Sequence, residues 1–202
     1  ALEELEYCAE QGAPMVKIHP PTMDVDPSNR AFLPFYRLCR KRNIIVMVHT
    51  GMEHAADIVG LENCDPQKLV PALELGCTVV AAHAGYGGFY DREDFYPSFE
   101  RLVQQYPSLY GDSSILGSMM RWRNIPRLLD HPLALSRMIF GTDYPFGSNA
   151  LVFWNRLSPT TLLALCAERN IFERDLQLKR RLGFPVSHFR LGAELLGLAS
   201  KG

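Results

Sequence analysis

Five short apolar runs, each ending in one polar residue, are the feature that most limits what this 202-residue chain can fold into. The runs are rich in β-branched residues, and each is closed by Gly, Pro, Ser or Thr. Their final polar residues are His19, His49, His83, Asp112 and Asp143. These residues recur about every 30 positions, which is the length of a strand plus a crossover helix. The pattern therefore predicts repeated βα units on a buried parallel sheet.

The segments between the runs carry helix signals. Asp65 precedes a proline in the arrangement of a helix N-cap, and Gly76 stands where that helix should end. The segments expected to be helical are residues 26–43, 65–76, 96–107, 125–132 and 158–199. No linker or low-complexity tract interrupts the chain, so we expect one domain over residues 1–202.

Repeated βα units leave two common architectures, the doubly wound open sheet and the (β/α)8 barrel. A dinucleotide-binding open sheet would show a glycine fingerprint after its first strand, and "KIHPPT" lacks one. The polar residues all stand at the C-terminal ends of predicted strands, where barrel active sites are assembled. The sequence therefore favours an α/β fold of the (β/α)8 TIM-barrel type, followed by C-terminal helices.

Composition excludes several classes of partner. The net charge of −1, with a pI near 6.7, gives no basic surface for nucleic acid. No apolar run approaches the roughly 18 residues of a membrane span. The five cysteines are odd in number and show no C-x-x-C spacing, which suits free thiols in a reducing compartment. We therefore expect a cytoplasmic protein that acts on a small-molecule substrate, with no nucleic-acid or membrane partner.

Three of the strand-end residues form a candidate metal site. A barrel brings its strand ends into one small volume, so His49, His83 and Asp143 are expected to converge. Two imidazoles and a carboxylate are ligands that hold zinc or a similar divalent ion while leaving a position open for water. The alternative role for Asp143 is that of a helix N-cap, and for each histidine a structural role at a strand end.

The motifs "VKIHP", "VHTG", "AHAG", "YGDSS" and "FGTDYPF", in this order over residues 12–146, resemble the amidohydrolase superfamily. The resemblance is to its amidohydrolase-related group, which includes metal-dependent hydrolases and nonoxidative decarboxylases. It implies a distorted (β/α)8 barrel with one or two divalent metal ions. In such proteins the metal ligands come from an H-x-H pair on the first strand, a histidine on the fifth and an aspartate on the eighth.

Carried onto this sequence, the resemblance makes His49 the fifth-strand metal ligand and Asp143 the eighth-strand carboxylate. His83 corresponds to the sixth-strand histidine that positions or polarises the attacking water or substrate. Asp143 would contact the divalent metal ion, for which we expect zinc, and would also accept a proton from the attacking water as general base. Catalytic roles thus fall on Asp143 and His83, and metal-binding roles on His49 and Asp143.

The sequence departs from the family pattern because it contains no H-x-H pair. The residues before Lys17 predict a helix leading into the family's fourth strand, so we expect strands equivalent to four to eight, with the first three missing. Fewer ligands predict weak metal binding by this chain. Exposed sheet edges predict a homo-oligomer. A catalytically incomplete half-barrel that acts through association is therefore one alternative function.

Substrate contacts are expected from three places. Lys17 and His19 share one face of the first strand because they lie two residues apart. Tyr86 belongs to the glycine- and aromatic-rich loop 85–95, which has the composition of a lid. Arg121, in segment 113–124, is a candidate partner for a substrate carboxylate. Its alternative is a solvated helix face on which Met119, Met120 and Trp122 pack inward. The remaining histidines, expected at the surface or in caps, are His54, His131 and His188.

The function that these features favour is metal-dependent hydrolysis of a small molecule by an activated water. The alternative is nonoxidative decarboxylation, with the metal ion as Lewis acid. A metal-dependent nuclease of the same superfamily is disfavoured by the near-neutral charge and by Lys17, where the resemblance to such nucleases would require a glutamate. The resemblance to binuclear members of the superfamily offers a further alternative, in which a carboxylated Lys17 bridges two metal ions.

Overall fold

The structure is a computed structural model that describes residues 1–54 and 57–198, and it divides into two compact units. The first unit comprises residues 1–87 and 91–111. Its elements, in chain order, are α1 (Leu2–Glu10), β1 (Met15–Ile18), α2 (Pro20–Met23), η1 (Arg30–Phe32), α3 (Leu33–Arg42), β2 (Ile45–His49), η2 (Leu61–Cys64), η3 (Pro66–Leu69), α4 (Val70–Glu74), β3 (Val79–Ala82), η4 (His83–Gly85), α5 (Tyr96–Gln105) and all but the last residue of β4 (Leu109–Asp112).

The second unit comprises residues 88–90 and the chain from Asp112 onward. Its elements are α6 (Asn124–Leu129), α7 (Pro132–Ser136), β5 (Met138–Ile139), η5 (Ala150–Phe153), α8 (Pro159–Ala167), α9 (Ile171–Arg181) and α10 (Val186–Leu195). Within the described residues, none of these helices is long and apolar enough to cross a membrane. The single domain expected over residues 1–202 stays a prediction.

The strands form one sheet in the order β1-β2-β3-β4-β5, which confirms the predicted succession of βα units. Each of the pairs β1–β2, β2–β3 and β3–β4 is parallel. Every residue of β3 is buried, as are four of the five in β2, because valine, isoleucine and alanine fill both faces of these strands. The parallel register places His49 opposite Ala82, so both strands end at the same level of the sheet.

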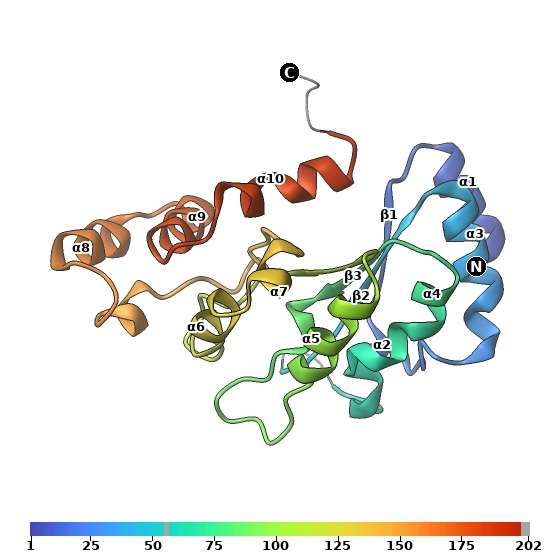
Figure 1. The fold of residues 1–202 in the computed structure, drawn as a ribbon, viewed down its shortest axis with the longest axis horizontal. Helices are drawn as coiled ribbons and strands as arrows, with labels where there is room; N and C mark the ends of the chain where they lie inside the picture. The colour runs from blue at the N-terminus through green and yellow to red at the C-terminus, as the bar shows by residue number, and fades with distance from the viewer. Residues whose placement is uncertain (55–56, 199–202) are drawn as a thin grey trace. The chain divides into compact units, whose positions relative to one another are not determined.

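The helices begin and end largely where the sequence predicts. The Asp65 carboxylate accepts a hydrogen bond from the Gln67 N–H at 2.8 Å and caps η3, which leads directly into α4. In segment 26–43 the α-helix is confined to α3, and it ends at Asn43 in the left-handed conformation after three basic residues. The predicted helix before the first strand is α1, which packs beside α3 (Figure 1). The segment from residue 158 is helical, as expected.

The cysteines are free thiols, as their spacing predicts. Cys39, Cys64 and Cys77 are buried and serve as small apolar side chains. Burial raises the pKa of Cys39 to about 12, which keeps this thiol protonated.

His188 lies in the interior of the second unit, so the expectation of a surface or capping position is wrong. Its side chain is buried between the rings of Phe184 and Phe189. The Nδ1–H group donates to the Met138 carbonyl at 2.9 Å, and Nε2 lies 2.9 Å from the Ser113 hydroxyl. These contacts satisfy a neutral imidazole and fasten α10 to β5. Burial lowers the pKa of His188 to about 4.

This buried imidazole predicts a loss of stability in mild acid. Because the pKa of His188 lies below its value in the unfolded chain, the unfolded state binds the extra proton first. Its contribution is fully present above about pH 6.5 and is lost as the pH falls towards 4, by about 3 kcal/mol. Urea unfolding at a series of pH values measures this loss. A His188→Gln variant should flatten the curve in that window, and an unchanged slope would contradict the assignment.

Candidate metal centre

The end of β2 is held against the end of β3 by Thr50. The Thr50 hydroxyl donates to the Ala82 carbonyl at 2.7 Å and accepts the Gly85 N–H at 2.9 Å, and all of these groups are buried. The Thr50 backbone N–H also donates to the Ala82 carbonyl, at 3.1 Å. As a result, the rings of His49 and His83 meet edge to face, with their centroids 5.0 Å apart.

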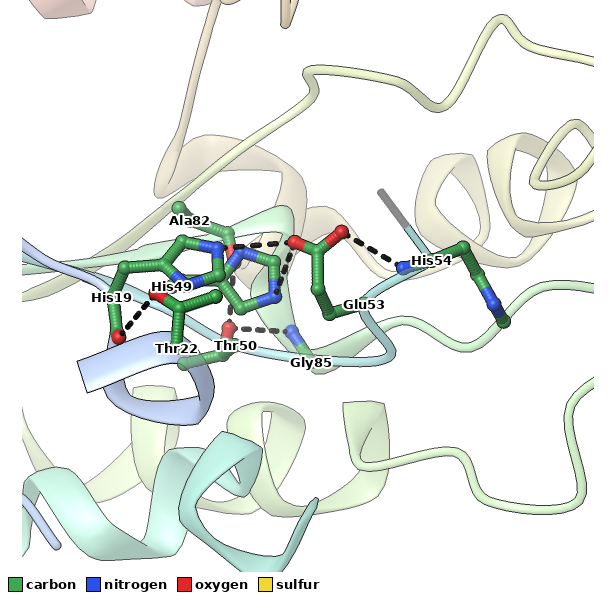
Figure 2. Close-up of polar contacts among 8 residues, drawn as sticks. All are labelled: His19, Thr22, His49, Thr50, Glu53, His54, Ala82 and Gly85. Carbon is green, nitrogen blue, oxygen red and sulfur yellow. Dashed lines mark hydrogen bonds and ion pairs between the residues drawn. The ribbon is translucent and has the colours of Figure 1, made fainter. Parts of the chain in front are cut away.

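Gly51 turns the chain away from β2. Its φ is 83°, and a Cβ atom there would lie 2.5 Å from the Tyr86 carbonyl oxygen. Only glycine fits such an approach without moving the backbone. The turn lets the chain come back towards its own strand end, so that Glu53 returns to His49 (Figure 2).

His19 follows β1 and lies on the other side of His49. The two ring centroids are 4.2 Å apart. Nδ1 of His19 lies 2.8 Å from the Thr22 hydroxyl, and its Nε2 lies 3.0 Å from the Oε2 atom of Glu53. The Thr22 hydroxyl also donates to the His19 carbonyl at 3.2 Å, so it is placed to accept the Nδ1–H group. With Nδ1 turned to Thr22, the Nε2 atom of His19 is the ring nitrogen that faces the Glu53 carboxylate.

Glu53 connects the two imidazoles. Its Oε1 atom accepts the His54 backbone N–H at 2.8 Å, which leaves Oε2 directed at the histidines (Figure 2). Oε2 lies 3.0 Å from Nε2 of His19 and 3.6 Å from Nε2 of His49. One donor atom from each of the three residues lies within 4.8 Å of the other two. We call His19, His49 and Glu53 the β1–β2 cluster.

The donor atoms of the β1–β2 cluster fit a divalent metal ion. An imidazole lone pair and a carboxylate oxygen only 3.0 Å apart repel each other unless a positive centre lies between them, either a proton on the nitrogen or a metal ion. His49 and Glu53 are largely buried, which weakens screening by water. Nitrogen and oxygen donors of this kind are those that zinc accepts.

The other predicted site residues of the first unit differ in solvent exposure. His83 is buried beside His49 and has a left-handed backbone, with φ of 64°. Tyr86 is fully buried, and its ring stacks on Tyr96 at a centroid distance of 4.1 Å. Lys17, by contrast, is exposed. The catalytic or substrate-binding role of each stays a prediction.

Asp143, in the second unit, follows β5 and opens a turn. Its φ is 57°, a left-handed value that aspartate tolerates better than most residues, and its carbonyl accepts the Phe146 N–H at 2.9 Å. No helix of the described chain begins at Asp143, so the alternative role as a helix N-cap is wrong. Its convergence with His49 and His83 stays a prediction.

A buried lysine fixes the chain just before Asp143. Lys179, on α9, is fully buried, and its ammonium group donates to the Gly141 carbonyl at 2.8 Å and to Asp175 at 2.7 Å. Asp175 in turn accepts the Ser148 hydroxyl. Burial lowers the pKa of Lys179, and the charge of Asp175 opposes that shift. Through these bonds α9 holds both sides of the turn that carries Asp143.

Segment 113–124 differs from its expected form. It consists of turns before α6, and Met119 is 59% exposed, so the predicted helix face with this methionine inward is wrong. Arg121 is almost fully buried. The Arg123 guanidinium lies 5.5 Å from the ring centroids of both Phe89 and Trp122. Its charge is thus directed at aromatic faces within the second unit.

Glu53 is the member of the β1–β2 cluster that sequence reasoning missed, and His19 was assigned only to substrate contact. The available signal was a carboxylate four residues after the strand-end His49, within a turn that begins with glycine. In an extended continuation of the strand that carboxylate would lie more than about 10 Å further along the chain direction. The turn at Gly51 is what returns it to the strand end.

Removing the buried charge on α9 should strongly destabilise the protein. We expect Lys179→Met to lower the free energy of unfolding by about 3–5 kcal/mol, because it leaves Asp175 buried without its counter-charge. Chemical denaturation measures the change. The matched control is Lys68→Met, since Lys68 forms an ion pair with Asp26 near the surface and should cost about 1 kcal/mol or less. Equal effects of the two substitutions would contradict this account.

Comparison with known proteins bears on both the family and the fold. A family model described as amidohydrolase matches residues 1–150. Among solved structures, an uncharacterised TIM-barrel protein from Bordetella bronchiseptica is similar, with a TM-score of 0.58 and 18% identity over 91% of this chain. The 2,6-dihydroxybenzoate decarboxylase from Rhizobium matches with a TM-score of 0.52 and 12% identity, over 98% of this chain and 67% of its own. An amidohydrolase from Mycobacterium avium subsp. paratuberculosis matches with a TM-score of 0.50 and 13% identity, over 100% of this chain and 55% of its own.

These likenesses show that the fold is that of a part of a TIM barrel. The chain spans 63% of the Bordetella protein. No curated protein matches the sequence significantly.

Proposed function

Because this chain belongs to the amidohydrolase family, we propose that it forms part of a metal-dependent hydrolase acting on a small molecule. The observation that carries the proposal is the position of His49. It is buried at the C-terminal end of a parallel strand, with His83 against one side of its ring and the Glu53 carboxylate in front of its Nε2 atom. In TIM barrels this end of the sheet is where catalytic groups gather.

The family's divalent metal ion, for which zinc suits the donors present, would be held by His49 together with Asp143. When bound, such an ion lowers the pKa of a coordinated water to about 7. Residues of this chain would transfer the proton and position the water and the substrate. The Asp143 carboxylate accepts a proton from the attacking water, and His83 positions that water or polarises the substrate carbonyl. Lys17, His19, Tyr86 and Arg121 are our proposed substrate contacts.

We further propose that β1 to β5 correspond to strands four to eight of the family's barrel. The sheet order follows the chain order, as it does around a barrel, and the α1 helix precedes β1 as the helix of a preceding βα unit would. The family's H-x-H pair belongs to the first strand, which is not among these five. The full ligand set is thus a property that we assign to the complete barrel.

A decarboxylase is the second candidate function. One of the similar structures is a 2,6-dihydroxybenzoate decarboxylase, and the resemblance covers nearly the whole of this chain. For this reaction Arg121 would bind the substrate carboxylate, and a metal ion held at the same centre would supply Lewis acidity. A third possibility is a half-barrel without catalytic activity that acts by association.

One experiment separates hydrolysis from decarboxylation. The chain is incubated with Zn²⁺, and with small amides and lactones in one series or with hydroxylated benzoates in the other. Release of a new carboxylic acid indicates hydrolysis, and release of CO2 indicates decarboxylation. We expect hydrolysis, and we expect Asp143→Asn to slow it by about 10²–10⁴-fold because the general base is lost.

The control for this assay is Glu3→Gln, the same kind of carboxylate-to-amide change at an exposed position of α1. It should leave the rate unchanged. CO2 release alone would replace hydrolysis by the decarboxylase. Turnover that Asp143→Asn does not slow would contradict the role of Asp143, and no turnover in either series would favour the inactive half-barrel.

We also propose that residues 1–202 form a homo-oligomer. Within the described residues β1 pairs with β2 alone, so its other edge presents unpaired backbone groups, and Lys17 is exposed on this strand. We expect light scattering to give a mass above that of one chain, rising with concentration. A compact monomer at high concentration would contradict this expectation.

The buried free thiols support a reducing compartment. We therefore propose a cytoplasmic location for the protein. Expression as a fluorescent fusion would test it, and accumulation outside the cytoplasm would contradict it.

A further inference from the structure

We propose that the β1–β2 cluster of His19, His49 and Glu53 is by itself a zinc site, formed within the first unit and independent of Asp143 for its affinity. The inference deepens the proposed function, because it concerns the same centre: it replaces Asp143 as a ligand by Glu53, changes His19 from a substrate contact to a ligand, and leaves Asp143 the role of base. Only its catalytic meaning rests on that function, since zinc binding can be measured without turnover.

The distances within the cluster are close to those that a bound ion requires. Ligand atoms about 2.0–2.1 Å from a tetrahedral zinc ion lie about 3.3 Å from one another. Oε2 of Glu53 is 3.0 Å from Nε2 of His19 and 3.6 Å from Nε2 of His49. No pair of donor atoms in the group is further apart than 4.8 Å, so modest side-chain movements bring all three to one ion.

The donor types select the metal. Two imidazoles and one carboxylate form the ligand set of several catalytic zinc sites, which keep a fourth position for water or substrate. Calcium and magnesium prefer sites made of oxygen atoms and are disfavoured by two nitrogen ligands. The cluster therefore favours zinc over these more abundant cations.

The groups behind the ligands are placed to orient them. Thr22 lies against Nδ1 of His19, with its own hydroxyl proton directed at the His19 carbonyl, and this arrangement leaves Nε2 for the metal ion. The His54 backbone N–H holds the Oε1 atom of Glu53 and leaves Oε2 for the ion. Such outer hydrogen bonds fix the tautomer and the orientation of metal ligands.

The backbone that carries the ligands is also restrained. The bonds of Thr50 to β3 fix the end of β2 that bears His49, and the tight turn at Gly51 sets the path to Glu53. His19 is followed by two buried prolines that open α2 and limit the conformations of this segment. Preorganised ligands lose less conformational entropy on binding than mobile ones do.

The number of ligands in the β1–β2 cluster removes the reason for expecting this chain to bind zinc weakly. The sequence predicts His49 and Asp143 as ligands, with His83 as the third member of the candidate metal site. The geometry adds His19 and Glu53, which brings the first unit to the three protein ligands that a catalytic zinc site normally has. Binding can then be strong even though the sequence lacks an H-x-H pair.

Calorimetric titration of residues 1–202 with ZnCl2 tests the assignment. We expect binding of one ion per chain, weakened at least about 100-fold by Glu53→Gln or His19→Gln because each substitution removes a ligand. Asp143→Asn should change the affinity by less than about threefold. Thr22→Val, which removes only the outer hydrogen bond, should weaken binding by about 10–100-fold. The matched control is His131→Gln, the same substitution at an exposed histidine, which should have no effect.

Two further measurements keep the result interpretable. Circular dichroism melts without metal show whether each variant is folded. Titration with Co²⁺ gives a visible absorption band when the ion is coordinated by the protein, and Glu53→Gln should reduce that band. If His19→Gln does not fold, Glu53→Gln and Thr22→Val still decide the question.

The outcomes separate this inference from the proposed function. Binding that Asp143→Asn abolishes and Glu53→Gln leaves intact would overturn the β1–β2 cluster as the site, while supporting the ligand pair of the family. No zinc binding by the folded chain would likewise overturn the inference. Binding that depends on His19 and Glu53, in a chain that fails the turnover assay, would support the inference and overturn only the catalytic proposal.

Discussion

The parallel register of β2 and β3, completed by the Thr50 hydroxyl, is the constraint on which the candidate centre depends. A parallel sheet ends its strands at one edge, but it does not by itself decide which side chains meet there. Thr50 makes that choice because its hydroxyl bonds to both Ala82 and Gly85, which lie before and after His83. The edge-to-face contact of the two imidazoles follows from this bridge. Threonine is well suited to the position, since one hydroxyl serves as both donor and acceptor for two buried backbone groups.

The second unit uses buried polar groups in the same way, at a greater energetic cost. The neutral His188 links β5 to α10, and the charged Lys179 links α9 to the Gly141 carbonyl. A buried ammonium is tolerated only where its hydrogen bonds and a counter-charge compensate for lost hydration, and Asp175 provides both. Both contacts come from helices beyond the residues that match the family model. The C-terminal helices therefore belong to the structural support of the Asp143 turn.

Most of the fold could be predicted from the sequence because the hydrophobic pattern and the polar and turn residues at strand ends are local signals. All five predicted strands exist, and His49 and His83 are neighbours, as their equivalent positions in the repeat imply. Glu53 and His188 could not be found in this way. The position of Glu53 depends on a positive φ at Gly51, and the burial of His188 depends on how α10 packs on β5. Neither tertiary contact leaves a periodic signal in the sequence.

The charge of the β1–β2 cluster helps to decide which of Glu53 and Asp143 serves as a metal ligand and which serves as a base. A neutral imidazole has one lone pair for a metal ion, so His49 would ligate one ion only, and any further ligands must share that ion. Two neutral imidazoles and one carboxylate around a divalent cation leave a net charge of about +1, which favours ionisation of a bound water. A second carboxylate in the coordination shell would neutralise this charge and weaken that effect. If Glu53 is the ligand, Asp143 is therefore chemically more useful as a base beside the ion than as a ligand bound to it, because a carboxylate outside the shell keeps its basicity for the proton.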